Sequence, residues 1–296
     1  MNRREFFKIV ALASLSAQLN LAPALYANTE VPLDPNLVAI FSDPHIPDDE
    51  TKPHIPRFKM CVKKILAMNP RPATLLIYGD LVYNHGGVEL YKILRSLLEP
   101  LDKAGIKWEV TMGNHDRIAD YQTACPDRFT EKPIIEGRCI HIVETPRADF
   151  ILLDSYLKDH VDGTIEPDQK AWLAETLKKY TEKPVFVGCH HGLKETKLDD
   201  VLLSCPKFAA YIHGHWHWWK NSKTDDGIQM ICFPSVGHWG DLGFTMCHLG
   251  EKEATFVPDI DGYFCPEWGK GRFPKIPNVE AYLEALNEVK VVVPFK

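Results

Sequence analysis

Five clusters of side chains that could bind metal ions recur along the chain, and each directly follows a short apolar run. Carboxylate, amide and imidazole groups are ligands that zinc, iron and manganese accept in proteins. If the apolar runs are neighbouring strands of a parallel sheet, their carboxyl ends bring the clusters together at one edge. Each cluster alone could be an ordinary turn or helix cap, but five in order predict one shared site. The clusters are Asp43 with His45, Asp80, Asn114 with His115 and Asp116, His190 with His191, and His215 with His217.

The elements that must position these clusters alternate between predicted strands and helices. Strands are predicted at 37–41, 74–78 and 108–112, and amphipathic helices at 57–68 and 89–104. This alternation implies parallel pairing through right-handed crossovers. We expect an α/β fold of the α+β sandwich type, with two packed mixed sheets flanked by helices. Further strands are predicted at 139–145, 150–154, 185–188, 209–212, 229–233, 244–248 and 253–257, and further helices after Pro167 and near 197–204.

The composition is that of a globular protein with one sizeable core. The chain has 296 residues, of which 45% are hydrophobic and 25% charged, and we expect residues 28–296 to form a single domain. Its end is predicted to contain a strand-rich part, 227–265, and a terminal helix, 279–289. A net charge of −6 gives no sign of general affinity for nucleic acids. The eight cysteines include no C-x-x-C pair, and several lie in apolar runs, which predicts buried thiols.

The N-terminal 27 residues have the layout of an export signal, with a basic start, a moderately apolar stretch and small residues near Ala27. The run from Arg3 and Arg4 to Lys8 resembles the twin-arginine motif, whose machinery exports folded proteins. We therefore expect the twin-arginine machinery as a partner, a periplasmic or extracellular location, and no stable membrane span. The alternatives are an uncleaved N-terminal anchor and an amphipathic N-terminal helix.

In their order, the five clusters resemble the motifs of the calcineurin-like metallophosphoesterase superfamily, within the branch that includes cyclic-nucleotide phosphodiesterases and purple acid phosphatases. The resemblance spans about 37–217 and implies a four-layer architecture with a two-metal centre. It implies divalent or mixed di- and trivalent ions such as Fe, Mn or Zn. One metal would take Asp43, His45, Asp80 and His217, and the other Asp80, Asn114, His190 and His215. His190 is preferred to His191 because it directly follows its strand.

The resemblance also implies hydrolysis of a small phosphodiester or phosphomonoester, such as a nucleotide, by a hydroxide that the two metals share. His115 would stabilise the phosphate or protonate the leaving oxygen, and Asp116 would orient its ring. Alternatively, Asp116 begins the next helix. Two other functions stay open at this point. One is a non-catalytic metal-binding protein. The other is a purple-type acid phosphatase, in which Tyr83 would bind ferric iron. Because purple acid phosphatases lack a histidine at the position of His45, we expect Tyr83 to lie beside the ligands rather than among them.

Several other polar and aromatic residues could shape a substrate pocket. Exposed tryptophans near a metal site can stack on a base or a sugar. The alternative is that most of the tryptophans pack against the second sheet. The pocket candidates are Tyr83, His85, His191, Trp216, Trp218, Trp219, His238 and Trp239.

Overall fold

The computed structural model of the protein describes residues 31–128, 133–271 and 275–296. The predicted export signal at 1–27 lies outside these residues. The assignment of 28–296 to a single domain stays a prediction. Within the described residues, no helix is both long and apolar enough to cross a bilayer.

The first sheet has six strands in the order β12-β11-β10-β1-β2-β3. The three predicted N-terminal strands form its parallel half, in which Ala39 pairs with Leu75 and Leu75 with Trp108. The C-terminal strands continue the sheet in antiparallel fashion from β1. The strands are β1 (Leu33–Ser42), β2 (Arg71–Tyr78), β3 (Lys107–Thr111), β10 (Gly240–Leu249), β11 (Glu253–Phe264) and β12 (Val291–Pro294).

The second sheet also has six strands, in the order β4-β5-β6-β7-β9-β8. Its four central strands are parallel, and the two edge strands are antiparallel to their neighbours. The strands are β4 (His141–Glu144), β5 (Asp149–Leu152), β6 (Val185–Cys189), β7 (Phe208–His213), β9 (Gln229–Cys232) and β8 (Lys220–Lys223). Both sheets are therefore mixed, as predicted.

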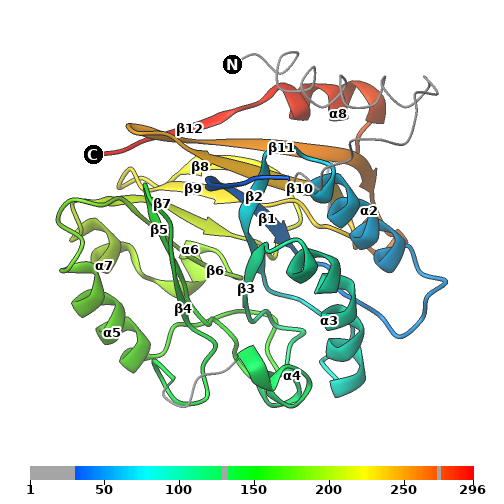
Figure 1. Cartoon of the computed structure of the whole chain (residues 1–296), viewed down its shortest axis with the longest axis horizontal. Helices are drawn as coiled ribbons and strands as arrows, with labels where there is room; N and C mark the ends of the chain where they lie inside the picture. The colour runs from blue at the N-terminus through cyan, green and yellow to red at the C-terminus, as the bar shows by residue number, and fades with distance from the viewer. Residues whose placement is uncertain (1–30, 129–132, 272–274) are drawn as a thin grey trace, which may run out of the picture.

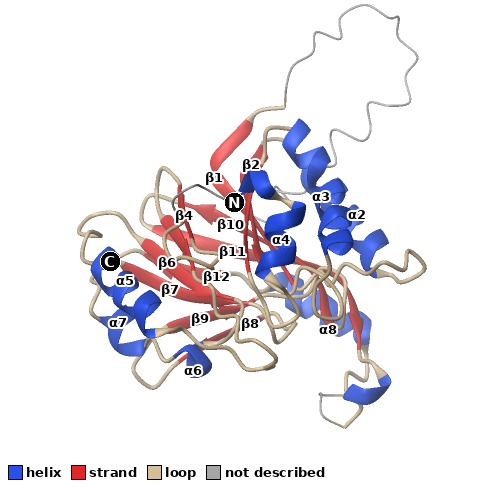
Figure 2. Cartoon of the chain, turned by 90° about the horizontal axis from the view of Figure 1, so that it is seen from below, coloured by secondary structure: helices blue, strands red, loops and turns tan. Residues whose placement is uncertain are grey.

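Helices cover the outer faces of the two sheets, as Figures 1 and 2 show. Three helices lie against the first sheet, and three lie beside the second. The last helix packs on β11. There the Asn287 side chain accepts a hydrogen bond from Ile260 N and donates one to Ile260 O. The helices are α2 (His54–Leu66), α3 (Val88–Lys103), α4 (Ile118–Ala124), α5 (Pro167–Leu177), α6 (Leu193–Thr196), α7 (Asp199–Leu203) and α8 (Val279–Glu288).

Strand β1 shows how the sequence builds the layers. Its side chains alternate between two cores because successive residues of a strand point to opposite faces. Val38 and Ile40 pack between the two sheets, while Ala39 and Phe41 pack under α2 and α3. A third core lies between the second sheet and α5 and α7. The result is the expected arrangement of helices, sheet, sheet and helices.

Some described elements were not predicted, and α4 was expected only in the alternative that starts a helix at Asp116. Strand β8 has the sequence KNSK, which offers no apolar alternation because it is an exposed edge strand. Strand β12 is a short run beyond the terminal helix, and α4 and α6 span only 7 and 4 residues. The prediction of buried thiols is confirmed: all eight cysteines are free, and only Cys265 is partly exposed.

Candidate metal centre

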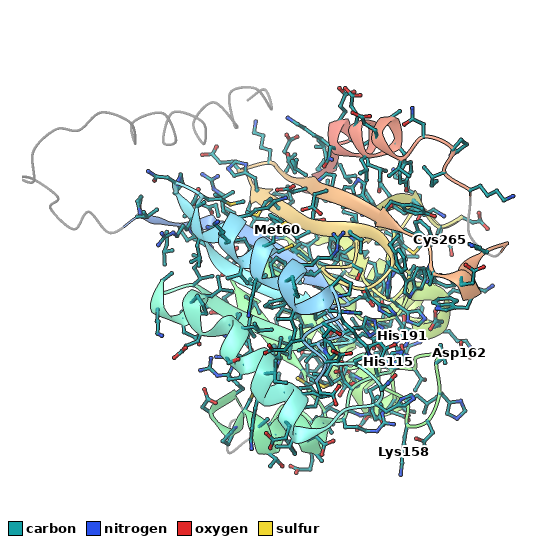
Figure 3. The ribbon with its side chains drawn as sticks, turned by 90° about the vertical axis from the view of Figure 1, so that its right-hand side faces the viewer. Met60, His115, Lys158, Asp162, His191 and Cys265 are labelled. Atoms are coloured by element: carbon teal, nitrogen blue, oxygen red, sulfur yellow. The ribbon has the colours of Figure 1, made fainter. Side chains whose placement is uncertain are left out.

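The five predicted clusters follow the carboxyl ends of β1, β2, β3, β6 and β7, and the two sheets bring these ends together. Backbone hydrogen bonds join the loops directly. Asp43 N donates to Gly79 O at 3.2 Å, His45 N to Asp80 O at 2.9 Å, and Gly214 N to His190 O at 3.1 Å. In Figure 3, the labels of His115 and His191 mark the side of the molecule on which the loops meet.

The backbone at these loops has an unusual conformation. Five of the seven predicted ligands have a positive φ between 44° and 68°, although none is a glycine. Such residues cost free energy and persist only where the surrounding structure requires them, which is common at functional sites. The five are Asp43, His45, Asp80, His215 and His217.

One group of donor atoms forms around Asp43, His45 and His217. Their ligand atoms lie within 4.8 Å of one another, and all three residues are buried. His217 Nε2 is 3.1 Å from Asp43 Oδ1, and His45 Nε2 is 3.5 Å from Asp80 Oδ2. The four residues expected for one metal are therefore assembled in one place.

A second group surrounds His190, whose side chain is fully buried. Its Nε2 atom lies 3.3 Å from Asp80 Oδ2 and 3.3 Å from Asn114 Oδ1. The Nδ1 atom of His215 is 3.2 Å from the same nitrogen. These four residues are the ones expected for the other metal, and Asp80 Oδ2 faces both groups.

The spacing and the pairing of these atoms fit bound cations. Donor atoms that share one ion at a bond length of about 2.0–2.2 Å lie roughly 3.0–3.5 Å apart, and the pairs described above have distances of 3.1–3.5 Å. Buried polar atoms normally have hydrogen-bond partners. Here Asp43 Oδ1 and both ring nitrogens of His45 are buried and have no hydrogen-bond partner among the described residues, although His217 Nε2 and Asp80 Oδ2 lie beside them. The residues present therefore fit the two metals that the resemblance implies.

Backbone carbonyls orient two of the imidazoles. The Nδ1 atom of His190 lies 2.8 Å from Tyr78 O, and that of His217 lies 2.9 Å from Trp239 O. If each Nδ1–H donates to its carbonyl, Nε2 keeps a lone pair directed into the site. Metal-binding histidines in proteins are commonly held in this way.

Burial and neighbouring charges set the protonation of the site. Burial alone would raise the pKa of Asp80, but His190 and then His45 hold the pKa well below its usual value. Burial, followed by the proximity of His238, lowers the pKa of His45 well below its usual value. Burial would likewise lower the pKa of His190, but the charges of Asp80 and Asp43 raise it to about 10. The ionised Asp80 and the neutral His45 suit cation binding, whereas the raised pKa of His190 means that this imidazole would release a proton when a metal binds.

The two neighbouring histidines on the loop after β6 have different surroundings. Both ring nitrogens of His191 are engaged away from Asp80: Nδ1 lies 2.7 Å from Ser155 Oγ and Nε2 lies 3.0 Å from Val161 O. The His191 ring nevertheless packs 4.6 Å from that of His215. Of the pair, His190 is the one directed at Asp80 and Asn114.

His115 lies at the site, but Asp116 does not orient its ring, and that prediction is wrong. The Asp116 carboxylate accepts hydrogen bonds from Leu81 N, Gly113 N and Tyr91 Oη at 2.8–3.1 Å. Burial and the charge of Asp80 raise its pKa to about 7. The alternative placed the start of the next helix at Asp116, whereas α4 begins two residues later, at Ile118, with Arg117 as its N-cap. Asp116 instead ties the loops after β2 and β3 together.

The His115 side chain has no such anchor. Its Nδ1 atom is buried without a partner among the described residues. Its ring lies 4.9 Å from that of His45 and is stacked on the exposed His85 at 5.4 Å. The structure therefore places His85, a pocket candidate, directly on the candidate acid.

The remaining pocket candidates differ in their positions. Trp216 is 50% exposed beside His215, and Trp239 stacks on His217 at 4.2 Å. Trp219 is buried in the core between the sheets, so the packing alternative holds for this residue. The His238 ring lies 4.2 Å from that of His45.

Tyr83 lies beside the ligands, with its ring 6.4 Å from that of His45. Sequence analysis missed His54, whose ring packs between Tyr83 and His238 at 5.7 and 5.2 Å. No local pattern singled it out, because it begins α2 nine residues after His45 and does not follow an apolar run.

The architecture and this donor set together define a metal-dependent phosphoester hydrolase. The model of the calcineurin-like phosphoesterase family matches residues 37–219, and the chain belongs to this family. It is 27% identical over 219 residues to a probable cyclic nucleotide phosphodiesterase of Psychrobacter arcticus, covering 65% of this chain and 75% of the relative. It is 26% identical over 214 residues to the 3',5'-cyclic adenosine monophosphate phosphodiesterase CpdA of Haemophilus influenzae, covering 66% and 74%.

The solved structures that resemble this one share its fold at low sequence identity. A dimetal phosphatase from Danio rerio superposes with a TM-score of 0.61 at 12% identity, covering 89% of this chain and all (100%) of that one. The purple acid phosphatase PPD1 from yellow lupin gives a TM-score of 0.57 at 12% identity, covering 78% and 52%. The predicted fold class is confirmed, and a non-catalytic role is set aside because the chain belongs to a family of phosphoesterases.

Proposed function

We propose that the protein hydrolyses small phosphodiesters, such as cyclic nucleotides, at a dinuclear metal centre. The observation that carries this proposal is the position of one oxygen atom. Asp80 Oδ2 lies 3.5 Å from His45 Nε2 and 3.3 Å from His190 Nε2, and so faces both groups of donors. A carboxylate in that position can bridge two cations.

The residues fall into two ligand sets in this proposal. Asp43, His45 and His217 would hold one ion, Asn114, His190 and His215 the other, and Asp80 both. When bound, two such ions would activate water and stabilise the attacking and leaving oxygens of phosphoryl transfer. Oxygen and imidazole donors in this mixture suit Fe, Mn or Zn.

The chain itself supplies groups for the reacting phosphate. His115 lies against His45, and its buried Nδ1 has no partner among the described residues. We assign it to stabilise a phosphate oxygen or protonate the leaving oxygen. Its backbone N–H donates to Asp80 Oδ1 at 2.9 Å, which fixes its position relative to the shared carboxylate.

The preference for diesters rests on the relatives. The two relatives described above are named as cyclic nucleotide phosphodiesterases. A purple-type acid phosphatase is disfavoured because Tyr83 lies with its ring 6.4 Å from that of His45, and His45 occupies the position beside Asp80.

The proposal is tested by an assay of the metal-loaded protein against bis-p-nitrophenyl phosphate, p-nitrophenyl phosphate and cyclic AMP. We expect the diesters to be hydrolysed faster than the monoester. Asp80→Asn should lose activity by at least about a thousandfold, or roughly 4 kcal/mol of transition-state stabilisation. Asp226→Asn, on an exposed turn, is the matched control and should retain activity. Hydrolysis by Asp80→Asn at the wild-type rate would refute the assignment.

We also propose that the protein is exported through the twin-arginine machinery, on the basis of Arg3 and Arg4 in the N-terminal sequence. Replacing both arginines by lysine keeps the charge and should leave the protein in the cytoplasm. Lys8→Arg is the control and should still be exported. Normal export of the double-lysine variant, measured by cell fractionation, would refute this route.

A further inference from the structure

A second pair of imidazoles lies beside the predicted metal centre without belonging to either ligand set. His54 is the first residue of α2, and His238 lies on the loop between β9 and β10. His54 Nε2 is 2.9 Å from His238 Nδ1, a hydrogen-bonding distance. The two residues are 184 positions apart in the sequence, so the fold itself creates the pair.

The loop that carries His238 is bonded to the loop that carries Asp43. Ser235 Oγ donates to Asp43 O at 2.8 Å and accepts from His238 N at 2.9 Å. Val236 N donates to Ser42 O at 2.9 Å. The backbone of His238 is therefore fixed relative to a predicted metal ligand.

Gly237 allows this loop to approach α2 closely. A Cβ atom at this position would lie 3.1 Å from His54 Cα, 3.2 Å from His54 O and 3.3 Å from Pro44 O. All three are backbone atoms, which cannot rotate away. A side chain at this position would therefore press the loop away from α2 and from His54.

The His238 ring faces one half of the centre. Its centroid lies 4.2 Å from that of His45 and 5.4 Å from that of His217, which are two predicted ligands of the same metal. His238 is only partly buried, and within the described residues its ring makes one hydrogen bond, to His54. Its Nε2 atom is thus left for another partner.

The surroundings of His54 indicate which nitrogen of His238 carries the proton. His54 Nδ1 is buried and has no partner among the residues that the structure describes. A buried N–H without an acceptor is rarer in proteins than a buried acceptor without a donor. The proton of His54 therefore belongs on Nε2, where it is donated to His238 Nδ1. Because His238 Nδ1 accepts this hydrogen bond, the single ring proton of a neutral His238 lies on Nε2.

We propose that His238 binds the substrate of this centre, donating its Nε2–H to an anionic phosphoryl oxygen, and that His54 is a positioning residue that fixes this tautomer. The inference rests on the proposed phosphoesterase function and names a contact within that site. A neutral donor is suited to a phosphate ester because it binds the anion without adding a charge beside the metals.

Activity and anion binding test the contact. For His238→Leu we expect kcat/KM on bis-p-nitrophenyl phosphate to fall by roughly ten- to a hundredfold, as for loss of a hydrogen bond to a charged group. Binding of inorganic phosphate, measured by calorimetry, should weaken similarly while two metals per chain are retained. His238→Gln, which keeps an N–H donor, should recover part of the loss. His248→Leu, on the exposed side of β10, is the matched control. Unchanged phosphate binding in His238→Leu would overturn the proposal.

The positioning role has its own variants. His54→Phe removes the donor to His238 but keeps an aromatic ring, and should lower kcat/KM several-fold. His54→Gln can still donate to His238 Nδ1, so its kcat/KM should be closer to that of the wild type. If the ring of His54 served only for packing, His54→Phe would have the higher kcat/KM of the two variants. This outcome would contradict the assignment.

Nitrogen-15 NMR of histidine-labelled, metal-free protein tests the pair independently of catalysis. We expect the Nε2–H tautomer for His238 in the wild type and its loss in His54→Phe. An Nδ1–H tautomer for His238 in the wild type would overturn the inference even if the enzyme is active. Conversely, a wild type with the expected tautomer but no hydrolysis of any phosphoester would refute the proposed function instead.

Discussion

At the scale of single residues, Asp80 joins the parts of the site through one carboxylate. Its Oδ2 atom faces His45 and His190, and its Oδ1 accepts the backbone N–H of His115 at 2.9 Å. A negative charge in a fully buried place is unfavourable unless cations or donors surround it. The neighbouring imidazoles and the backbone N–H of His115 surround this charge, and in the proposed enzyme two cations held by the same imidazoles would balance it.

A different buried carboxylate, that of Asp154, makes a pH prediction away from the metals. It accepts hydrogen bonds from Cys139 N and Tyr156 N at 3.0 and 2.9 Å, yet burial raises its pKa to about 6. The folded state therefore binds this proton more tightly than the unfolded state, whose pKa is about 3.9. By linkage, the contribution of Asp154 to stability falls as pH rises from about 4 to about 6 and is constant above.

The prediction is checked by urea unfolding of the chelator-treated wild type and of Asp154→Asn between pH 4 and 7. As the pH rises across that interval, the free energy of unfolding of the wild type should fall by roughly 1–3 kcal/mol relative to that of the variant. The comparison with the variant removes the titration of all other groups. A constant difference in the free energy of unfolding would show that Asp154 does not titrate there.

Some residues of the site can be predicted from the sequence, and the contacts of others cannot. The ligand candidates could be found because each follows an apolar run directly, and the structure assembles them as expected. The partners of Asp116 could not be found, since they are backbone N–H groups of Leu81 and Gly113 and the hydroxyl of Tyr91. Such contacts depend on how loops fold, which residue types do not reveal.

At the scale of elements, strand ends and the glycines beside them set the geometry. Gly113 follows β3, and a Cβ atom there would lie 2.2 Å from Asp80 Oδ1 and 2.4 Å from Asp80 N. The backbone of one loop thus occupies the space that a side chain on the other would need. Close approach of two backbones is a common reason for glycine at such positions.

We therefore expect Gly113→Ala to displace Asp80 and to lose metals and most activity. The overlap with backbone should also lower the free energy of unfolding by roughly 1–3 kcal/mol. Gly192→Ala is the matched control, because a Cβ atom there would have nothing closer than 3.7 Å. Metal analysis and thermal unfolding check both variants. Full metal content in Gly113→Ala would contradict the role given to this close contact.

The elements were predicted unevenly, for physical reasons. Buried parallel strands such as β2 are continuous apolar runs and are easily found. The long strand β11 was expected to end at residue 257 but continues to Phe264, because pairing with β10 extends it through the polar residues 259 and 261. Tertiary pairing of this kind overrides local sequence patterns.

At the scale of the whole molecule, the centre takes its residues from both sheets. The first sheet provides Asp43, Asp80 and Asn114, and the second provides the histidines at 190, 215 and 217. Metals bound between them would stabilise the packing of the sheets, since a ligand that binds only the folded state adds to its stability.

Metal removal should therefore lower stability as well as activity. At a metal concentration about a thousand times the dissociation constant, binding adds roughly 4 kcal/mol. We expect chelation to lower the Tm of the wild type and re-addition of metal to restore it. The Tm of the Asp80→Asn variant should change much less when metal is removed and added back. Equal responses of the two proteins would contradict a structural role for metals shared through Asp80.

The most direct test is a crystal structure of the metal-loaded protein with anomalous difference maps. We expect two peaks, both within bonding distance of the Asp80 carboxylate, with Asp43, His45 and His217 around one and Asn114, His190 and His215 around the other. A single peak, or two peaks of which Asp80 touches only one, would contradict the dinuclear centre.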